Sequence, residues 1–135
     1  MPQVLLVSSD SEDAEKFSSC DDYILRFVFA EALLKKASVS TTITDLMREC
    51  DAVVVDVNAD LGMLRVLQVS AYALDIPVIG FVSTEGIPEA LRENLVAVFK
   101  TRQEALTSLR LLLSVMGSAG PDYAEAVATI QAAGI

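Results

Sequence analysis

Short, almost wholly apolar segments recur along the chain, and polar loops follow them. They are residues 3–7, 51–57, 77–82 and 96–99. Apolar runs of this length are typical of strands that are buried on both faces of a parallel sheet. Because helical patterns separate them, we expect an α/β fold: a three-layer sandwich with a five-stranded parallel sheet, Rossmann-like or flavodoxin-like.

The first half of the chain supplies the remaining strand and the first helix of this prediction. Residues 21–36 carry apolar side chains at helical spacing, with acids at the start and lysines at the end, which predicts a long helix. Residues 39–43 alternate and are rich in β-branched types, which predicts the second strand, and Thr44 can cap a short helix through Glu49.

The second half is predicted to continue the alternation. Helices are expected at 63–74, 89–93 and 101–116. We therefore expect a single α/β domain over residues 1–116. The tail, residues 117–135, can add one short amphipathic helix.

Composition removes several classes of function. The 135 residues are 53% hydrophobic, enough for one domain with a core, and the net charge of −9 disfavours nucleic acid and anionic membranes as partners. The absence of histidine excludes Ser-His-Asp triads, Cys-His dyads and imidazole-bound metals. Cys20 and Cys50 lack zinc-site or disulfide spacing, and no apolar run is long enough for a membrane helix, so we expect a cytoplasmic protein.

Polar loops at the carboxyl ends of the predicted strands are the expected ligand site, as in other open parallel sheets. These loops are residues 8–19, 58–62 and 83–86. The first has serines but no glycine, so it matches neither a P-loop nor a GxGxxG motif. Its hydroxyls, at Ser8, Ser9 and Ser11, can hold a sugar or phosphate, or can simply cap the following helix.

Asp56, at the end of a predicted strand, is the best single candidate for chemistry. Asp60 follows four residues later, and Asp10 is expected across the crevice. Clustered carboxylates can bind Mg²⁺, accept a phosphoryl group or act as a general base. The alternative is that Asp56 caps the following turn with its own side chain.

The stretch 50–81, CDAVVVDVNADLGMLRVLQVSAYALDIPVIGF, resembles the core of the nucleoside 2-deoxyribosyltransferase family. That family has a DAVVA strand, an Asp-x-Gly-Thr turn, a helix ending in Gly-x-Ala-x-Ala-Leu, and a PVI strand. VLLVSSDSEDAEKF is similar to its first strand and ligand loop, and ENLVAVFKTRQEAL to its Asn-Leu segment, last strand and closing helix.

The family's catalytic glutamate has no counterpart here. In the family it attacks the anomeric carbon and forms a covalent intermediate. The resemblance places Leu67 or Val66 at that position, with Gln68 adjacent and Met63 in place of the usual threonine.

The resemblance therefore implies a protein that binds a nucleoside or nucleotide without glycosyl transfer. If activity remains, Asp56 or Asp60 would have to replace the glutamate at an N-glycosidic bond. The implied ligand-binding residues are Ser8, Ser9, Asp10, Gly62, Ser70, Ser83 and Asn94.

Response-regulator receiver domains offer an alternative, because VLLVSSD, DAVVVDV, PVIGFVST and VFK are similar to their motifs. This resemblance implies Asp56 as phosphoacceptor, with Ser83 or Thr84 as the hydroxyl and Lys100 as the lysine. Ser8 and Ser9 stand where receivers carry the acids that hold Mg²⁺. Such a receiver would be degenerate; apart from this Mg²⁺, no cofactor or metal is expected.

The helix predicted at 63–74 is apolar on most sides, with Arg65, Gln68 and Tyr72 as a polar edge. A helix of this kind needs two apolar neighbours. One is the sheet, and the other is expected to be the same helix of a second subunit, which gives a homodimer. The alternative is that the C-terminal tail folds back over it.

Overall fold

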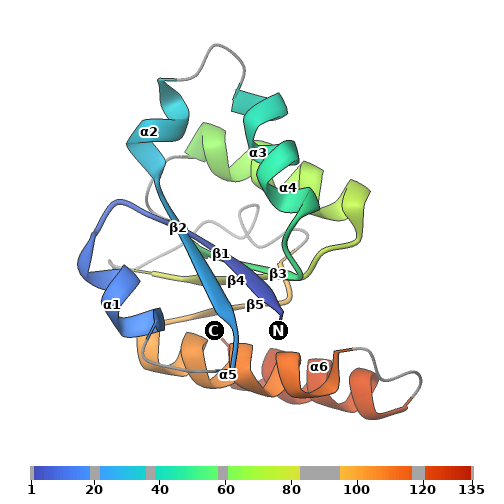
Figure 1. Cartoon of the computed structure of the whole chain (residues 1–135). Helices are drawn as coiled ribbons and strands as arrows, with labels where there is room; N and C mark the ends of the chain where they lie inside the picture. The colour runs from blue at the N-terminus through green and yellow to red at the C-terminus, as the bar shows by residue number, and fades with distance from the viewer. Residues whose placement is uncertain are drawn as a thin grey trace.

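Five parallel strands form one sheet in the order β2-β1-β3-β4-β5 (Figure 1). The computed structural model describes residues 2–18, 22–35, 39–57, 61–82, 95–116 and 121–134. The strands are β1 (Gln3–Ser8), β2 (Ile24–Phe29), β3 (Ala52–Asp56), β4 (Val78–Phe81) and β5 (Ala97–Phe99). The predicted α/β sandwich with a five-stranded parallel sheet is confirmed, and its strand order is that of flavodoxin-like folds.

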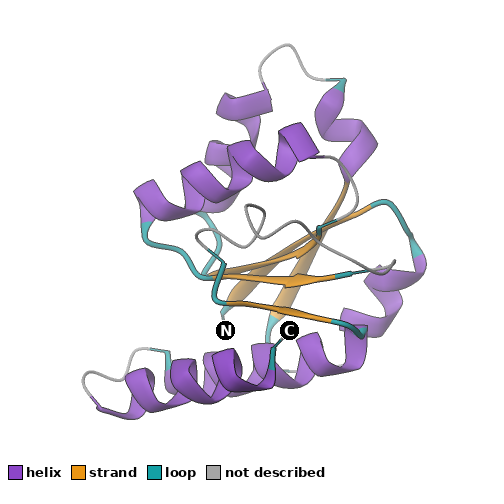
Figure 2. Cartoon of the chain, turned by 180° about the vertical axis from the view of Figure 1, so that it is seen from behind, coloured by secondary structure: helices purple, strands orange, loops and turns teal. Residues whose placement is uncertain are grey.

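Helices cover both faces of the sheet (Figure 2). One layer contains α1 (Glu12–Ser18), α5 (Arg102–Val115) and α6 (Pro121–Ala133). The opposite layer contains α2 (Ala30–Leu34), α3 (Val39–Arg48) and α4 (Leu61–Leu74). Among the described residues, no helix combines the length and hydrophobicity needed to cross a bilayer.

Strand side chains alternate between the two helical layers. In β1, Leu5 and Val7 lie in the core that α3 and α4 share, whereas Val4 and Leu6 lie in the core that α1 and α5 share. Both faces of this strand are buried, which explains why its sequence is a continuous apolar run.

The long helix predicted over 21–36 is wrong. Strand β2 occupies Ile24–Phe29, and only the short α2 follows it. Pairing with β1, from Gln3↔Ile24 to Ser8↔Phe29, overrides the helical spacing of the apolar side chains. Residues 21 and 36 lie outside the described residues.

The strand predicted over 39–43 is wrong as well, because α3 runs through these residues. Ile43 and Met47 are fully buried and lie one helical turn apart, so a single apolar stripe fixes the helix. This burial outweighs the β-propensity of the neighbouring Val39, Thr41 and Thr42. Thr44, expected to cap a helix, lies inside α3.

The second half of the chain follows the prediction closely. At the start of α5, the Thr101 hydroxyl accepts a hydrogen bond from the backbone N–H of Glu104 at 3.1 Å, as its capping sequence indicates. The predicted helix over 89–93 lies outside the described residues.

The tail forms α6, which packs beside α5 with Ala126 and Ile130 in the core. At its end, a Cβ on Gly134 would lie 3.1 Å from the Val98 carbonyl oxygen, so α6 finishes against the backbone of β5. The described part of the tail therefore leaves Val69 and Tyr72, on the outer face of α4, exposed.

Candidate functional site

All five strands end in one row at the carboxyl edge of the sheet. The register pairs Val7 with Val55 and then Asp56 with Phe81, so Ser8, the next residue of β1, ends beside Asp56. β1 leads through α1 to β2 on one side of the sheet, and the chain then returns to β3 on the other side. The edge between β1 and β3 is thus the topological switch point, where open α/β sheets bind ligands.

Ser8 and Asp56 face the layer of α1 and α5. By the alternation of the strands, Ser8 shares a face with Leu6, and Asp56 shares one with Val54, and both apolar residues belong to the core beneath α1 and α5. Ser8 is fully buried, and Asp56 is 5% exposed. The two polar side chains therefore lie at the carboxyl end of an apolar face of the sheet and are almost fully buried.

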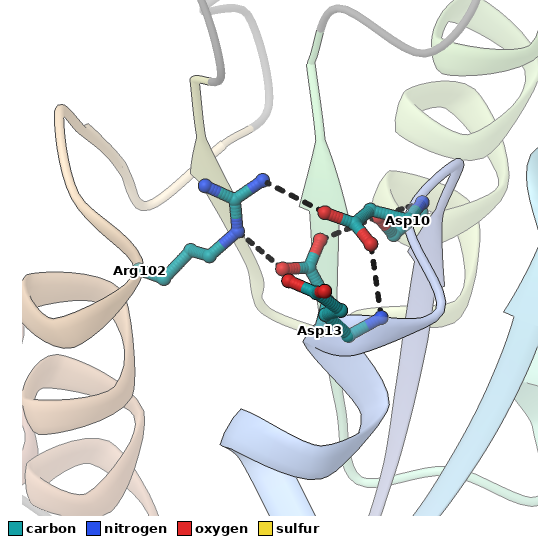
Figure 3. Close-up of polar contacts among 5 residues, drawn as sticks. Asp10, Asp13 and Arg102 are labelled. Atoms are coloured by element: carbon teal, nitrogen blue, oxygen red, sulfur yellow. Dashed lines mark hydrogen bonds and ion pairs between the residues drawn. The ribbon is translucent and has the colours of Figure 1, made fainter.

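A buried carboxylate, Asp13, organises the polar groups at this edge. It lies in the first turn of α1 and has no exposed surface. The Ser8 hydroxyl donates to its Oδ2 at 2.6 Å, and the Arg102 Nε–H donates to its Oδ1 (Figure 3). Both carboxylate oxygens are occupied, so the charge is buried together with its partners, as burial of an ion requires.

Arg102, the first residue of α5, connects this carboxylate to the surface. Its Nη2 lies 4.0 Å from Asp10 Oδ2, and its guanidinium carbon lies 5.1 Å from the Phe81 ring centroid. Phe17 stacks on Phe81 with a centroid distance of 5.8 Å. Ion pairing and cation–π contact hold the guanidinium in one place.

The loop after β1 is fixed by its own hydrogen bonds. The Asp10 N–H donates to Ser8 Oγ at 3.1 Å, and Asp10 Oδ1 accepts from the Glu12 N–H at 2.9 Å. Asp10 Oδ2 faces Arg102 and is part of a side chain that is 44% exposed. Asp10 is therefore the carboxylate of this loop that a ligand can reach.

A hollow of about 390 Å³ opens beside Arg102, between α1 and α5. Lys16 and Gln103 supply polar groups to its wall, and Phe17 and Leu106 supply apolar surface. This volume lies within the usual range for small-molecule sites.

The other candidate residues lie apart from this hollow or outside the described residues. Ser9 is exposed on the same loop, and Gly62 is exposed in the first turn of α4. The Ser70 hydroxyl lies 3.1 Å from that of Thr44, so it contacts α3 and not Ser8. Lys100 is exposed directly after β5. Those outside the described residues are Asp60, Ser83, Thr84 and Asn94.

Helix α4 offers no acid to a bound sugar. Leu67 is fully buried in the core, and Val66 is half-buried against it. The sequence of α4, LGMLRVLQVSAYAL, contains neither Asp nor Glu. The polar edge predicted for this helix needs one correction: Gln68 is 3% exposed, whereas Arg65 and Tyr72 face solvent.

Two central residues of the site, Asp13 and Arg102, are not among the site residues that the sequence predicts. They are 89 residues apart, and no motif joins them. The available signal was weak: Asp13 falls one helical turn before the apolar Phe17, on the side of α1 that must face the sheet. Within the described residues, no group of three Asp, Glu or Cys side chains could hold a metal ion.

No family model matches the chain, and no curated protein matches it. Its function is therefore inferred from the residues and contacts of the carboxyl edge.

Proposed function

We propose that the protein binds a nucleoside or nucleotide at the carboxyl edge of β1 and β3 and does not transfer the glycosyl group. The observation that carries this proposal is the hollow of about 390 Å³ beside the fixed Arg102 at the switch point of the sheet. A ligand there would lie against Arg102 and Phe17, which line the hollow, with Asp10 next to Arg102.

These groups suit the mixed chemistry of a nucleotide. The exposed Asp10 carboxylate can accept hydrogen bonds from sugar hydroxyls. Among the described residues, Arg102 uses its Nε for the hydrogen bond to Asp13 and its Nη2 for the ion pair with Asp10, which leaves the Nη1 N–H groups for a phosphate or a base carbonyl. Phe17 and Leu106 can contact the apolar face of a base.

The lack of glycosyl transfer follows from the missing carboxylate. A covalent glycosyl intermediate needs a carboxylate that reaches the anomeric carbon. Leu67 is buried and α4 has no acid, while Asp56 is only 5% exposed. Binding without turnover is the function that these residues support.

Calorimetric titration with nucleosides and nucleoside monophosphates tests the proposal. We expect saturable binding that Asp10→Asn weakens about tenfold, because Asn keeps the oxygen that accepts from Glu12 but loses the charge. Asp45→Asn, an exposed site on α3, is the matched control and should bind like the wild type. Chromatography should detect no free base, and failure of every nucleoside and nucleotide to bind would refute the proposal.

The receiver-like alternative is favoured by one observation, the position of Asp56 at the end of β3 with Lys100 after β5. It predicts that acetyl phosphate with Mg²⁺ adds one phosphoryl group in intact-mass spectra and that Asp56→Asn prevents this. The near burial of Asp56 and the lack of a metal-holding acid group among the described residues support ligand binding instead.

We also propose a homodimer through α4 and a cytoplasmic location. Val69 is 65% exposed and Tyr72 is 76% exposed on the outer face of this helix, which a second subunit would cover. Sedimentation should show a dimer that Val69→Glu dissociates, whereas a wild-type monomer at high concentration would exclude this interface.

Cys50 is a free thiol, which suits a reducing compartment.

A further inference from the structure

Two adjoining hollows lie at the opposite, amino-terminal edge of the sheet. Their volumes are about 530 and 420 Å³, and they share the lining residues Asp75, Ile76, Pro77 and Tyr123. Pro77 directly precedes β4, and Asp51, in the smaller hollow, directly precedes β3. We call this pair of hollows the amino-edge groove, and it is separate from the site at Asp10 and Arg102.

Among the described residues, the charges that line the amino-edge groove are all negative. Asp75 and Asp51 are its charged residues, and no Lys or Arg of the described chain lines it. Asp51 Oδ2 accepts from the Gln3 N–H at 2.8 Å. The Asp75 carboxylate makes no hydrogen bond or ion pair with the described residues and is exposed. It is therefore available to a positive group from outside.

Two tyrosines flank this carboxylate. Tyr72 comes from the end of α4 and Tyr123 from the start of α6, and both line the larger hollow together with Ile76 and Pro77. The faces of tyrosine rings attract organic cations, and aliphatic side chains hold the apolar part of such a ligand.

The backbone of Asp75 adopts the left-handed conformation that ends α4. Asp75 has φ of 56° and follows α4 in a Schellman motif, with Ile76 N–H bonded to the Ala71 carbonyl at 3.0 Å and Asp75 N–H to that of Tyr72 at 3.3 Å. Glycine is the residue that adopts this position at the lowest cost. Glycine at position 75 would therefore stabilise the C-terminus of α4 more than the aspartate does.

We infer that the amino-edge groove binds a small organic cation that joins an ammonium group to an apolar body. The ammonium pairs with the Asp75 carboxylate beside the rings of Tyr72 and Tyr123, and the apolar body lies on Ile76 and Pro77. The net charge of −9 draws such a ligand to the protein. This site does not depend on nucleotide binding.

Titration with phenethylammonium chloride, followed by NMR and calorimetry, tests this inference, with neutral 2-phenylethanol as the comparison. We expect phenethylammonium to bind at least about tenfold more tightly than the alcohol. Asp75→Asn tolerates the same backbone conformation and should remove this preference. Tyr123→Leu should weaken binding about threefold. Asp45→Asn and Asp10→Asn should leave it unchanged.

Asp75→Gly separates a binding role from a structural one. It should raise the thermal midpoint and at the same time abolish the preference for the cation. Repeating the titration with Val69→Glu keeps Tyr72 accessible if the protein dimerises through α4. Equal binding of the alcohol and the ammonium, no binding of either at millimolar concentration, or an unchanged preference in Asp75→Asn would overturn the inference.

Discussion

The two helical layers of the sandwich solve the burial of polar groups differently. The layer of α1 and α5 buries an ion pair, Asp13 with Arg102, and ties it to Ser8 on the sheet. Among the described residues, the polar side chains that the layer of α3 and α4 buries are uncharged, as in the contact between the Thr44 and Ser70 hydroxyls. Both contacts join elements that are far apart in the sequence. The two contacts differ in the group that stays buried without a partner when one residue is replaced: a carboxylate in the first and a hydroxyl in the second.

A buried carboxylate without its cation is far more costly than a buried hydroxyl without its neighbour. Asp13 is fully enclosed and has all its partners, so its charge is tolerated only as part of the set. We call the layer of α1 and α5 the charged layer and that of α3 and α4 the neutral layer, because the described helices of the latter bury no charged side chain. The charged layer should therefore be sensitive to loss of a partner, and the neutral layer to the introduction of a charge.

The largest expected effect comes from placing a carboxylate in the neutral layer. Leu67→Glu removes a buried leucine and adds an acid without a partner, so we expect a loss of at least about 4 kcal/mol, measured by urea unfolding. Leu67→Met, which keeps the volume, should cost less than about 1.5 kcal/mol. A stable Leu67→Glu variant would show that this layer can accommodate charge.

Breaking the charged contact should come next in size. Arg102→Met leaves Asp13 buried and uncompensated, and we expect a loss of about 3–5 kcal/mol in the free energy of unfolding. The double variant Asp13→Asn with Arg102→Met should recover part of this loss, because the charge is gone. Arg110→Met, in an exposed pair with Asp22, is the control and should cost less than about 1 kcal/mol. Equal effects at the two arginines would remove the contrast.

The hydroxyl contact should matter less. Ser70→Ala and Thr44→Val should each lower the free energy of unfolding by about 1 kcal/mol. A double-mutant cycle between them isolates the contact, and its coupling should stay below that of Asp13 with Arg102. A coupling of similar size in the two cycles would show that charge is not what separates the layers.

The smallest expected effect is the pH dependence that the Cys50 thiol gives to the free energy of unfolding. Cys50 lies in the core of the neutral layer. Burial raises the pKa of its thiol; nearby Arg26 lowers this pKa, and Asp51 and Glu49 raise it. Because the folded pKa is raised, the stabilisation of the neutral thiol is complete below the unfolded pKa and is lost as pH rises through the folded value. In a Cys20→Ser background, iodoacetamide should alkylate Cys50 slowly at pH 8 and faster only under strongly alkaline or denaturing conditions. Rapid alkylation of the folded protein at pH 8 would contradict this.

The strands that lie in the middle of the sheet were predictable from sequence, and the edge strand β2 was not. Both faces of β3 and β4 are buried, so their sequences are continuous apolar runs with one interpretation. β2 is only half-buried, and its mixture of Arg26 with aliphatic and aromatic residues also fits a helix. Pairing with β1 decides between the two, and such a long-range contact leaves no local pattern.

The candidate site divides in the same way. Ser8, Asp10 and Asp56 could be found because the ends of parallel strands meet at one edge. Asp13 and Arg102 could not, because their contact depends on how α1 and α5 pack on the sheet. Asp75 could not be singled out for another reason: its left-handed backbone conformation is not revealed by composition.

The strand order β2-β1-β3-β4-β5 also bears on how the chain is made. During synthesis, each strand after β1 pairs with a strand that has already been translated. β2 adds to one side of β1, and β3, β4 and β5 add in turn on the other side. The sheet can thus grow outward from β1 without waiting for a later strand to insert in the middle. The placement of α6 against β5 requires the chain up to Gly134 to have left the ribosome.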